Sequence, residues 1–345
     1  MDLTIAVDLA KSVFEVAVSR APGEVLERRR LTRTGFAAFV GKSGPCTVIM
    51  EACSSSHFWA RQFVAIGHRP ILLPPHHVRP YRTNANKTDR ADAKALLEAF
   101  RNKEIHPVPI KSVEQQAISA IHRLRSGWMA TRTACINTLR GLLREFGLVI
   151  PVGSQHVVAQ VSAWLREENP AIPSAIRTLL SATCDQIVEL EAHMRSAEAQ
   201  LAELVRDMPE VKRLRTIPGV GPRSASALVA IVGDPRRFKS GRHFASFLGL
   251  TPRERSSGNF RKLGSISKRG DTYLRMLLIH GARAVLLSAR RRKDRHRIHS
   301  WVLEVEARRG HNVSAVALAN KIARIAWATW SRQQDYRPAV AQDAT

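Results

Sequence analysis

Cysteine is scarce in this chain of 345 residues: the four present are Cys46, Cys53, Cys135 and Cys184, and no two have Cys-x-x-Cys spacing. This argues against a zinc site and favours a reducing cytoplasm. No apolar segment approaches the roughly 18 residues that a membrane-spanning helix needs. No secretory signal precedes the strand pattern near Leu3, so we expect a cytoplasmic protein without a membrane partner.

Acidic residues are also few. Only 29 Asp and Glu stand against 54 Lys and Arg, which gives a net charge of +25 and an isoelectric point near 11.2. The excess is uneven, because residues 1–110 carry net +6 whereas residues 205–310, with 25 basic and 8 acidic side chains, carry net +17. So basic a balance predicts a polyanionic partner, and a nucleic acid fits better than a membrane surface.

Four of the acids occupy positions that packing explains poorly. Asp8 closes the first apolar run, Glu51 follows a second strand-like run, and Asp89 and Asp92 lie three apart where a helix begins. An i, i+3 pair shares one helix face, so carboxylates at two strand ends and one helix start can converge. Four of them would repel strongly without cations between them. The set suits two Mg²⁺ ions, which prefer such oxygens and promote displacement at phosphorus.

Residues 1–108 predict an α/β domain with an antiparallel start. Strands at 3–7, 13–18 and 25–31 should form a meander with a turn at 21–24, and Thr34 should cap the first helix. We expect helices at 36–41, 57–66 and 89–102, with further strands at 47–50 and 70–73. This order is typical of the ribonuclease-H-like fold, although periodicity alone supports only the α/β class.

Residues 109–208 predict two long helices joined by a proline-containing segment at 151–173. Each helix has an apolar seam near heptad spacing. The seams are Ile121, Leu124, Trp128, Cys135 and Leu142, and then Ile187, Leu190, Met194, Ala197, Leu201 and Leu204. Such helices form either a pair within one chain or a dimerising coiled coil, and the spacing does not separate the two.

Residues 209–335 predict a mostly helical domain, followed by a disordered tail at 336–345. The turn at 217–221 looks like a helix-hairpin-helix, in which Gly219 and Gly221 let backbone N–H groups approach a phosphate. Helices at 273–289 and 314–330 should form the core. The basic segment 254–270 has no apolar period, and we expect the charge run at 290–295 to be a solvated face.

At this point the chain strongly resembles a known family over nearly its whole length. The matching segments are Val7–Lys11, Met50–Cys53, His57–Arg61 and Asn86–Ala93, and then Ile217–Gly221, Phe247–Arg253, Ser257–Gly258 and Lys268–Gly270. They resemble DEDD transposases of bacterial insertion sequences, the Piv-like recombinases of the insertion-sequence one-ten group. The Glu-Ala-Cys stretch at Glu51 is similar to the eleven-eleven branch.

The resemblance implies a RuvC-like N-terminal domain whose metal-binding tetrad is Asp8, Glu51, Asp89 and Asp92. It also implies a C-terminal transposase domain with a nucleophilic serine, which is Ser257 here.

Members of the family excise and insert a mobile element. The implied cofactor is Mg²⁺, two ions, for which Mn²⁺ can substitute. The implied partners are the DNA of the element and its target, a structured bridge RNA as guide, and further copies of the chain in a dimer or tetramer. The resemblance also implies that the protein acts in the bacterial cytoplasm, at the nucleoid.

The chemistry fits these residues, because a serine hydroxyl needs activation and a charge clamp to attack a phosphodiester. The basic side chains near Ser257 are candidate phosphate contacts. They are Arg253, Arg255, Arg261, Lys262, Lys268 and Arg269.

Three alternatives stay open. Ser256 rivals Ser257 as the nucleophile. A RuvC-like nuclease of the Holliday-junction-resolvase type would use the same tetrad with water, and a non-catalytic nucleic-acid-binding module would use only the basic half. For the enzyme readings, neutralising one carboxylate should abolish activity, and relief of repulsion should maintain or raise stability.

Overall fold

The computed structural model describes residues 3–21, 24–82, 89–258, 260–291 and 296–338, but not the side chains of 89–91. The chain folds into two compact units, Met1–Val113 and Glu114–Thr345. Parts of the turn expected at 21–24, of the charge run at 290–295 and of the tail at 336–345 lie outside these residues.

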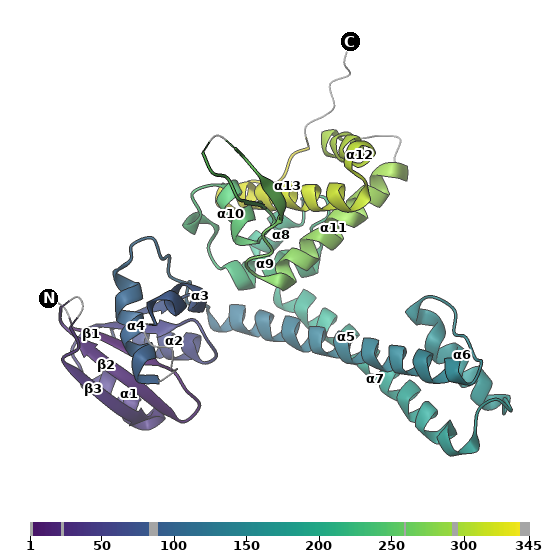
Figure 1. Ribbon diagram of the computed structural model, residues 1–345, viewed down its shortest axis with the longest axis horizontal. Helices are drawn as coiled ribbons and strands as arrows, with labels where there is room; N and C mark the ends of the chain where they lie inside the picture. Colours follow the sequence, from purple (N-terminus) through teal and green to yellow (C-terminus); the bar gives the residue numbers. More distant parts are fainter. Residues whose placement is uncertain (1–2, 22–23, 83–88, 259, 292–295, 339–345) are drawn as a thin grey trace, which may run out of the picture. The chain divides into compact units, whose positions relative to one another are not determined.

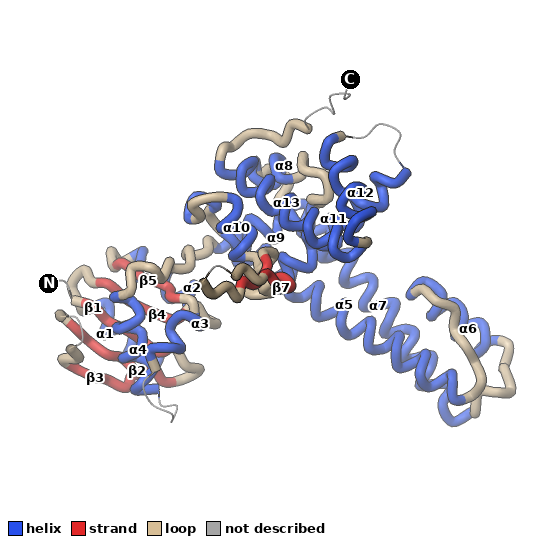
Figure 2. The backbone as a smooth tube through the Cα atoms, turned by 45° about the horizontal axis from the view of Figure 1, so that its top comes forward, coloured by secondary structure: helices blue, strands red, loops and turns tan. Residues whose placement is uncertain are grey.

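The N-terminal unit is built on a mixed five-stranded sheet (Figures 1 and 2). Its strands are β1 (Thr4–Asp8), β2 (Val13–Ser19), β3 (Glu27–Thr32), β4 (Thr47–Glu51) and β5 (Arg69–Leu73). The order is β3-β2-β1-β4-β5, with β3, β2 and β1 antiparallel and β1, β4 and β5 parallel. An antiparallel meander continued by parallel strands confirms the predicted α/β class and is compatible with a ribonuclease-H-like domain.

Helices cover both faces of this sheet. They are α1 (Arg33–Lys42), α2 (Ser56–Ala65), α3 (Pro75–Val78), the 3₁₀ turn η1 (Arg79–Tyr81) and α4 (Asp89–Arg101). On one face, Phe36 of α1 and Trp59 of α2 pack edge-on against each other and against Phe14 of β2. On the other face, Leu96 of α4 packs with Ile49 of β4. The layered core therefore fixes the strand ends and the start of α4 relative to one another.

The cap of α1 differs from the prediction. Thr32, not Thr34, is the N-cap, and its Oγ1 accepts a hydrogen bond from the backbone N–H of Gly35 at 3.1 Å. Both threonines are plausible caps in sequence. The end of β3 at Thr32 decides between them, because the helix starts with the next residue.

The second unit begins with a long pair of helices, α5 (Val113–Glu145) and α7 (Ser174–Leu204), which run side by side in Figure 1. Two ion pairs cross between them, Arg125–Glu198 at 2.7 Å and Arg132–Glu191. The predicted joining segment contains η2 (Ser154–His156) and α6 (Val157–Arg166). The pair within one chain, one of the two arrangements left open by the sequence, is therefore present.

The seam predicted on α7 is confirmed, whereas that on α5 is wrong at Leu124 and Leu142, although Ile121 and Cys135 pack half-buried against the cores. Leu190, Met194 and Leu201 of α7 are buried, but Leu124 and Leu142 of α5 are 56% and 50% exposed. The buried positions of α5 form a different stripe, which comprises Ile118, Ser119, His122, Ile136, Leu139 and Leu143. The buried stripe includes the polar Ser119 and His122, which heptad counting of apolar residues does not detect, and it packs against α7 and the C-terminal helices.

The remaining helices form one apolar core. They are α8 (Pro209–Leu214), α9 (Pro222–Val232), η3 (Pro235–Arg237), α10 (Gly241–Phe247), α11 (Thr272–Arg291), α12 (Arg297–Arg309) and α13 (His311–Ser331). The two predicted core helices match α11 and α13. The basic segment is not irregular throughout, because β6 (Pro252–Glu254) and β7 (Leu263–Ile266) pair in it as an antiparallel hairpin.

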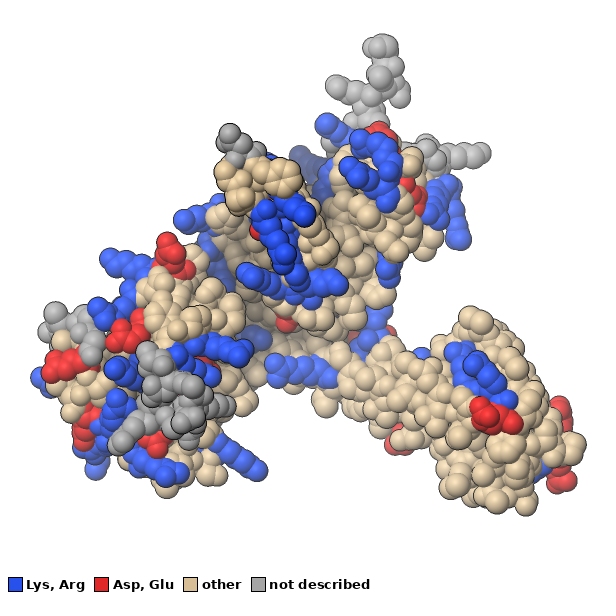
Figure 3. Space-filling model, in the orientation of Figure 1, with Lys and Arg blue, Asp and Glu red and all other residues tan. Residues whose placement is uncertain are grey.

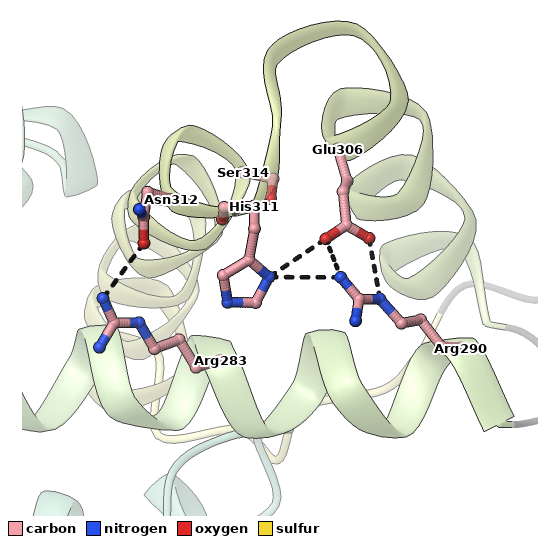
Figure 4. A network of polar contacts seen from close by, with 6 residues as sticks. All are labelled: Arg283, Arg290, Glu306, His311, Asn312 and Ser314. Atoms are coloured by element: carbon pink, nitrogen blue, oxygen red, sulfur yellow. Dashed lines mark hydrogen bonds and ion pairs between the residues drawn. The ribbon is translucent and has the colours of Figure 1, made fainter.

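Part of the predicted charge run is paired rather than simply solvated. Arg290 at the end of α11 forms a two-pronged ion pair with Glu306 of α12, and His311 Nδ1 of α13 lies 3.1 Å from Glu306 Oε1 (Figure 4). The hydrogen bond from Arg290, the largest cause, lowers the pKa of Glu306. This network joins the ends of three helices.

Candidate active site

Asp8 and Glu51 end two neighbouring parallel strands. Val7 of β1 is the register partner of Met50 of β4, so the residues that follow them lie at the same edge of the sheet. Both are half-buried. Both carboxylates also lie close enough to Cys53 to affect it. Burial raises the pKa of the Cys53 thiol, and the negative charges of Glu51 and Asp8 raise that pKa further. The structure thus brings these two predicted residues together.

Asp92 joins this pair through an arginine. Its side chain on α4 is buried, and its Oδ1 lies 2.8 Å from Arg82 Nε. Arg82 Nη2 also donates a hydrogen bond to Glu51 Oε1 at 3.0 Å. One guanidinium therefore bridges two of the predicted carboxylates. Sequence reasoning missed Arg82, and its position shortly before the Asn86–Ala93 motif was the available signal.

Asp89 is the first residue of α4, as predicted, but its side chain lies outside the described residues. Across the described part of the chain, no group of three or more His, Cys, Asp or Glu is arranged to hold a metal ion. The donor chemistry nevertheless fits Mg²⁺ or Mn²⁺, because carboxylate oxygens are hard ligands.

The hairpin between β6 and β7 carries both candidate serines. Ser257 and Phe260 exchange two backbone hydrogen bonds, at 3.2 and 3.1 Å, and Gly258 turns the chain with φ +54°. The Ser256 hydroxyl donates to Glu254 Oε1 at 2.9 Å. Within the described residues, no comparable bond engages the exposed Ser257 hydroxyl. The two neighbours therefore differ, since Ser256 is held and Ser257 is open to a substrate.

At the base of the hairpin, two glycines pack so closely against the backbone that no side chain would fit. A Cβ at Gly249 would lie 2.0 Å from the carbonyl oxygen of Arg269, and one at Gly270 would lie 1.9 Å from that of Phe247. Both glycines have positive φ, +71° and +96°. The buried Arg275 donates to the carbonyl oxygen of Leu248 at 3.2 Å. These contacts anchor the exposed hairpin to the helical core.

Basic side chains surround the two serines. Figure 3 shows Lys and Arg gathered along the hairpin. All six predicted phosphate contacts are exposed, namely Arg253, Arg255, Arg261, Lys262, Lys268 and Arg269. Arg261 Nε also lies 3.1 Å from Glu254 Oε1. With most of these charges unshared, the hairpin presents a cationic strip suited to a polyanion.

The turn at 217–221 connects α8 and α9, as predicted. Gly219 has φ +83°, and a Cβ there would lie 2.8 Å from the carbonyl oxygen of Gly281 in α11, so packing alone explains this glycine. Gly221 is the N-cap of α9 and has open space beside it. The turn, α5 and α11 line an open pocket of about 1760 Å³, in which Arg125, Arg215 and Arg223 are basic.

Family models match most of both units. The model described as a transposase matches residues 5–147, and the model of the "Transposase IS116/IS110/IS902 family" matches residues 211–298. A "Probable family 20 transposase" of Pseudomonas aeruginosa is 44% identical over 335 residues, which cover 97% of this chain and 98% of that relative. The chain belongs to the IS116/IS110/IS902 family of transposases.

Two other relatives of this transposase extend the comparison. The "Transposase for insertion sequence element IS1111A" of Coxiella burnetii is 36% identical and covers 96% of this chain and 91% of that relative. The "Pilin gene-inverting protein" of Moraxella lacunata is 34% identical over 103 residues, which cover 28% of this chain and 32% of that relative. The protein is therefore a DNA transposase, which confirms the predicted enzyme class.

Among the helices formed by the described residues of this transposase, none combines the length and the apolar character of a membrane-spanning segment.

Proposed function

We propose that this transposase moves its element by a serine-nucleophile reaction that depends on a divalent metal ion. The observation that carries the proposal is the placement of the acids: Asp8 and Glu51 end adjacent strands, and Arg82 holds Asp92 against Glu51. Asp89 lies one turn before Asp92 on α4. Magnesium ions held by these four residues would stabilise the charge that develops on a phosphodiester.

Ser257 would supply the attacking oxygen. Its Oγ forms an ester bond to phosphorus while one P–O bond of the DNA backbone breaks. The serine hydroxyl loses its proton, and the departing DNA oxygen gains one. The open position of Ser257 supports this role over Ser256, whose hydroxyl is bonded to Glu254. The covalent phosphoserine link would conserve the energy of the broken bond for strand rejoining.

The exposed basic strip of the hairpin would hold the DNA backbone through phosphate contacts. The backbone N–H groups at Gly219 and Gly221 are further candidates, because Gly221 caps the N-terminus of α9 and Arg215 and Arg223 line the adjoining pocket. The test is strand exchange between element ends and target DNA in Mg²⁺. Asp92→Asn and Ser257→Ala should each abolish exchange, and Ser256→Ala should retain it. Exchange by Ser257→Ala at the wild-type rate would refute the serine's role.

We also propose that a structured RNA from the element's flanks guides the reaction. The net charge of +17 over residues 205–310 supports a second polyanion. The transposase should bind this RNA more tightly than an unrelated RNA of equal length at moderate salt. Equal affinity would count against guidance.

Assembly into a dimer or tetramer would use exposed apolar side chains on α5 and just beyond it. Leu124 and Leu142 of α5 are 56% and 50% exposed, and Phe146 and Val149, which follow the end of α5 at Glu145, are 37% and 68% exposed. Such apolar exposure is typical of a surface that another copy covers. Leu124→Glu combined with Leu142→Glu should reduce the mass in sedimentation. A monomeric wild-type protein at micromolar concentration would contradict the proposal.

A further inference from the structure

Arg82 occupies the space between two of the acids proposed as metal ligands. Its Nε lies 2.8 Å from Asp92 Oδ1, and its Nη2 lies 3.0 Å from Glu51 Oε1. The side chains of Asp92, Glu51 and Arg82 are only 7%, 15% and 26% exposed. This is a sheltered contact rather than a pair at the open surface, where such contacts contribute little.

The local fold fixes where Arg82 projects. Its backbone N–H donates to the carbonyl oxygen of Arg79 at 3.2 Å, which closes the turn of η1. Val78 on one side of the turn is fully buried. On the other, the hydroxyl of Tyr81 accepts a hydrogen bond from Asn102, just beyond α4, at 2.8 Å. The turn is thus attached to the layer that carries Asp92.

We propose that Arg82 is a built-in competitor of the divalent cation. Its guanidinium holds Glu51 and Asp92 together in the metal-free protein and withdraws from them when metal ions bind. This inference rests on the proposed function, because it requires the acidic residues to be the metal ligands. It adds a residue that sets the metal affinity without itself being a ligand.

Charge and geometry explain the competition. A guanidinium presents N–H donors in a rigid fork that matches carboxylate oxygens. Glu51 Oε1 accepts a hydrogen bond from Nη2, whereas Nε meets Asp92 Oδ1 as an ion pair without a hydrogen bond. We expect a divalent cation that binds both carboxylates to displace the guanidinium from these two contacts. One positive charge cannot neutralise the four carboxylates of the proposed tetrad, whereas two divalent ions can. Arg82 therefore preserves the cluster while keeping its metal affinity low.

The test is Mn²⁺ binding to the full-length protein, measured by calorimetry and by water-proton relaxation. Arg82→Gln should bind Mn²⁺ at least roughly tenfold tighter than wild type, since the charge-assisted hydrogen bond to Glu51 and the ion pair with Asp92 no longer oppose binding. Arg79→Gln is the matched control, because it removes the same charge three residues away from an exposed side chain. Its affinity should remain at the wild-type value.

The Mn²⁺ affinities of the three proteins separate the competition by Arg82 from the existence of the metal site. Equal or weaker binding by Arg82→Gln than by Arg79→Gln would overturn the competition but leave the metal site standing. No Mn²⁺ binding by any of the three proteins would overturn the metal site itself, and the inference with it.

A second measurement on wild type avoids dependence on a variant's folding. Mn²⁺ should speed the modification of Arg82 by phenylglyoxal, followed by mass spectrometry, and leave Arg79 unchanged. An unchanged rate at Arg82 in protein that binds Mn²⁺ would overturn the proposal.

Discussion

The hydroxyl of Tyr273 on α11 lies 2.9 Å from Nδ1 of His122 on α5. On its other side, His122 Nε2 lies 3.0 Å from Ser226 Oγ of α9. The Ser226 hydroxyl donates its proton to the carbonyl oxygen of Pro222 at 2.8 Å. The serine oxygen therefore accepts from Nε2–H, and Nδ1 accepts from Tyr273. A buried, neutral histidine thus joins three helices.

This histidine predicts a pH-dependent stability of the helical unit. Burial, followed by the charges of Arg125 and Arg223, lowers the pKa of His122 from 6.5 to about 4. An unfolded chain takes up a proton near pH 6.5, whereas the folded protein resists protonation down to about pH 4. The free energy of unfolding should therefore fall by about 3 kcal/mol over that interval, with no His122 contribution to the slope above it. Urea titrations at several pH values measure this.

The control is His122→Gln, which should be less stable at neutral pH and should lose less stability on acidification than wild type. Equal pH slopes for the two proteins would show that His122 does not cause the effect.

Gly219 and Gly221 form a matched pair for a second prediction. Gly219→Ala places a Cβ against the backbone of Gly281 at φ +83° and should lower the free energy of unfolding by about 2 kcal/mol or more. Gly221 has φ −84° and open space, so Gly221→Ala should leave stability nearly unchanged. Thermal melts of the two variants check this, and equal losses would show that the close approach of the helices is not what requires Gly219.

Asp92→Asn tests the balance between repulsion and pairing. If repulsion within the acidic tetrad acted alone, Asp92→Asn would be as stable as wild type or more stable. The contact with Arg82 reverses this expectation, and we predict a loss of about 1 kcal/mol in the metal-free protein. Glu98→Gln on the same helix, which breaks an exposed pair with Arg101, should change stability little. If denaturant titration finds Asp92→Asn more stable than wild type, repulsion dominates.

The sequence located the two strand-end acids because an apolar run followed by a carboxylate requires only local reasoning. It could not place Arg82, since the bridge depends on how η1 packs against α4. It also placed the exposed Leu124 and Leu142 in the seam of α5, because the face that α5 buries depends on the helices that pack against it. The β6–β7 pairing escaped prediction because nearly all side chains of this hairpin are exposed. A strand without a buried face has no alternation of apolar and polar residues, so hydrophobic periodicity does not predict it.

The basic strip predicts a steep salt dependence of DNA binding. Arg255→Gln and Lys262→Gln should each reduce the slope of log affinity against log salt by about 0.9, if each contacts one duplex phosphate. Arg166→Gln, an exposed arginine at the end of α6, should leave the slope unchanged. Fluorescence anisotropy at several salt concentrations measures the slopes. Equal reductions in all three variants would mean that the hairpin acts only through net charge.

The proposed reaction joins Ser257 covalently to DNA. The most direct measurement incubates labelled element-end DNA with wild type, Ser257→Ala and Ser256→Ala in Mg²⁺, quenches in denaturant and separates protein-bound label. We predict an adduct with wild type and with Ser256→Ala, and none with Ser257→Ala, although all three proteins bind the DNA. An adduct that persists in Ser257→Ala, or cleavage by wild type without any adduct, would contradict the account. The second result would favour metal-dependent hydrolysis of the RuvC-like kind.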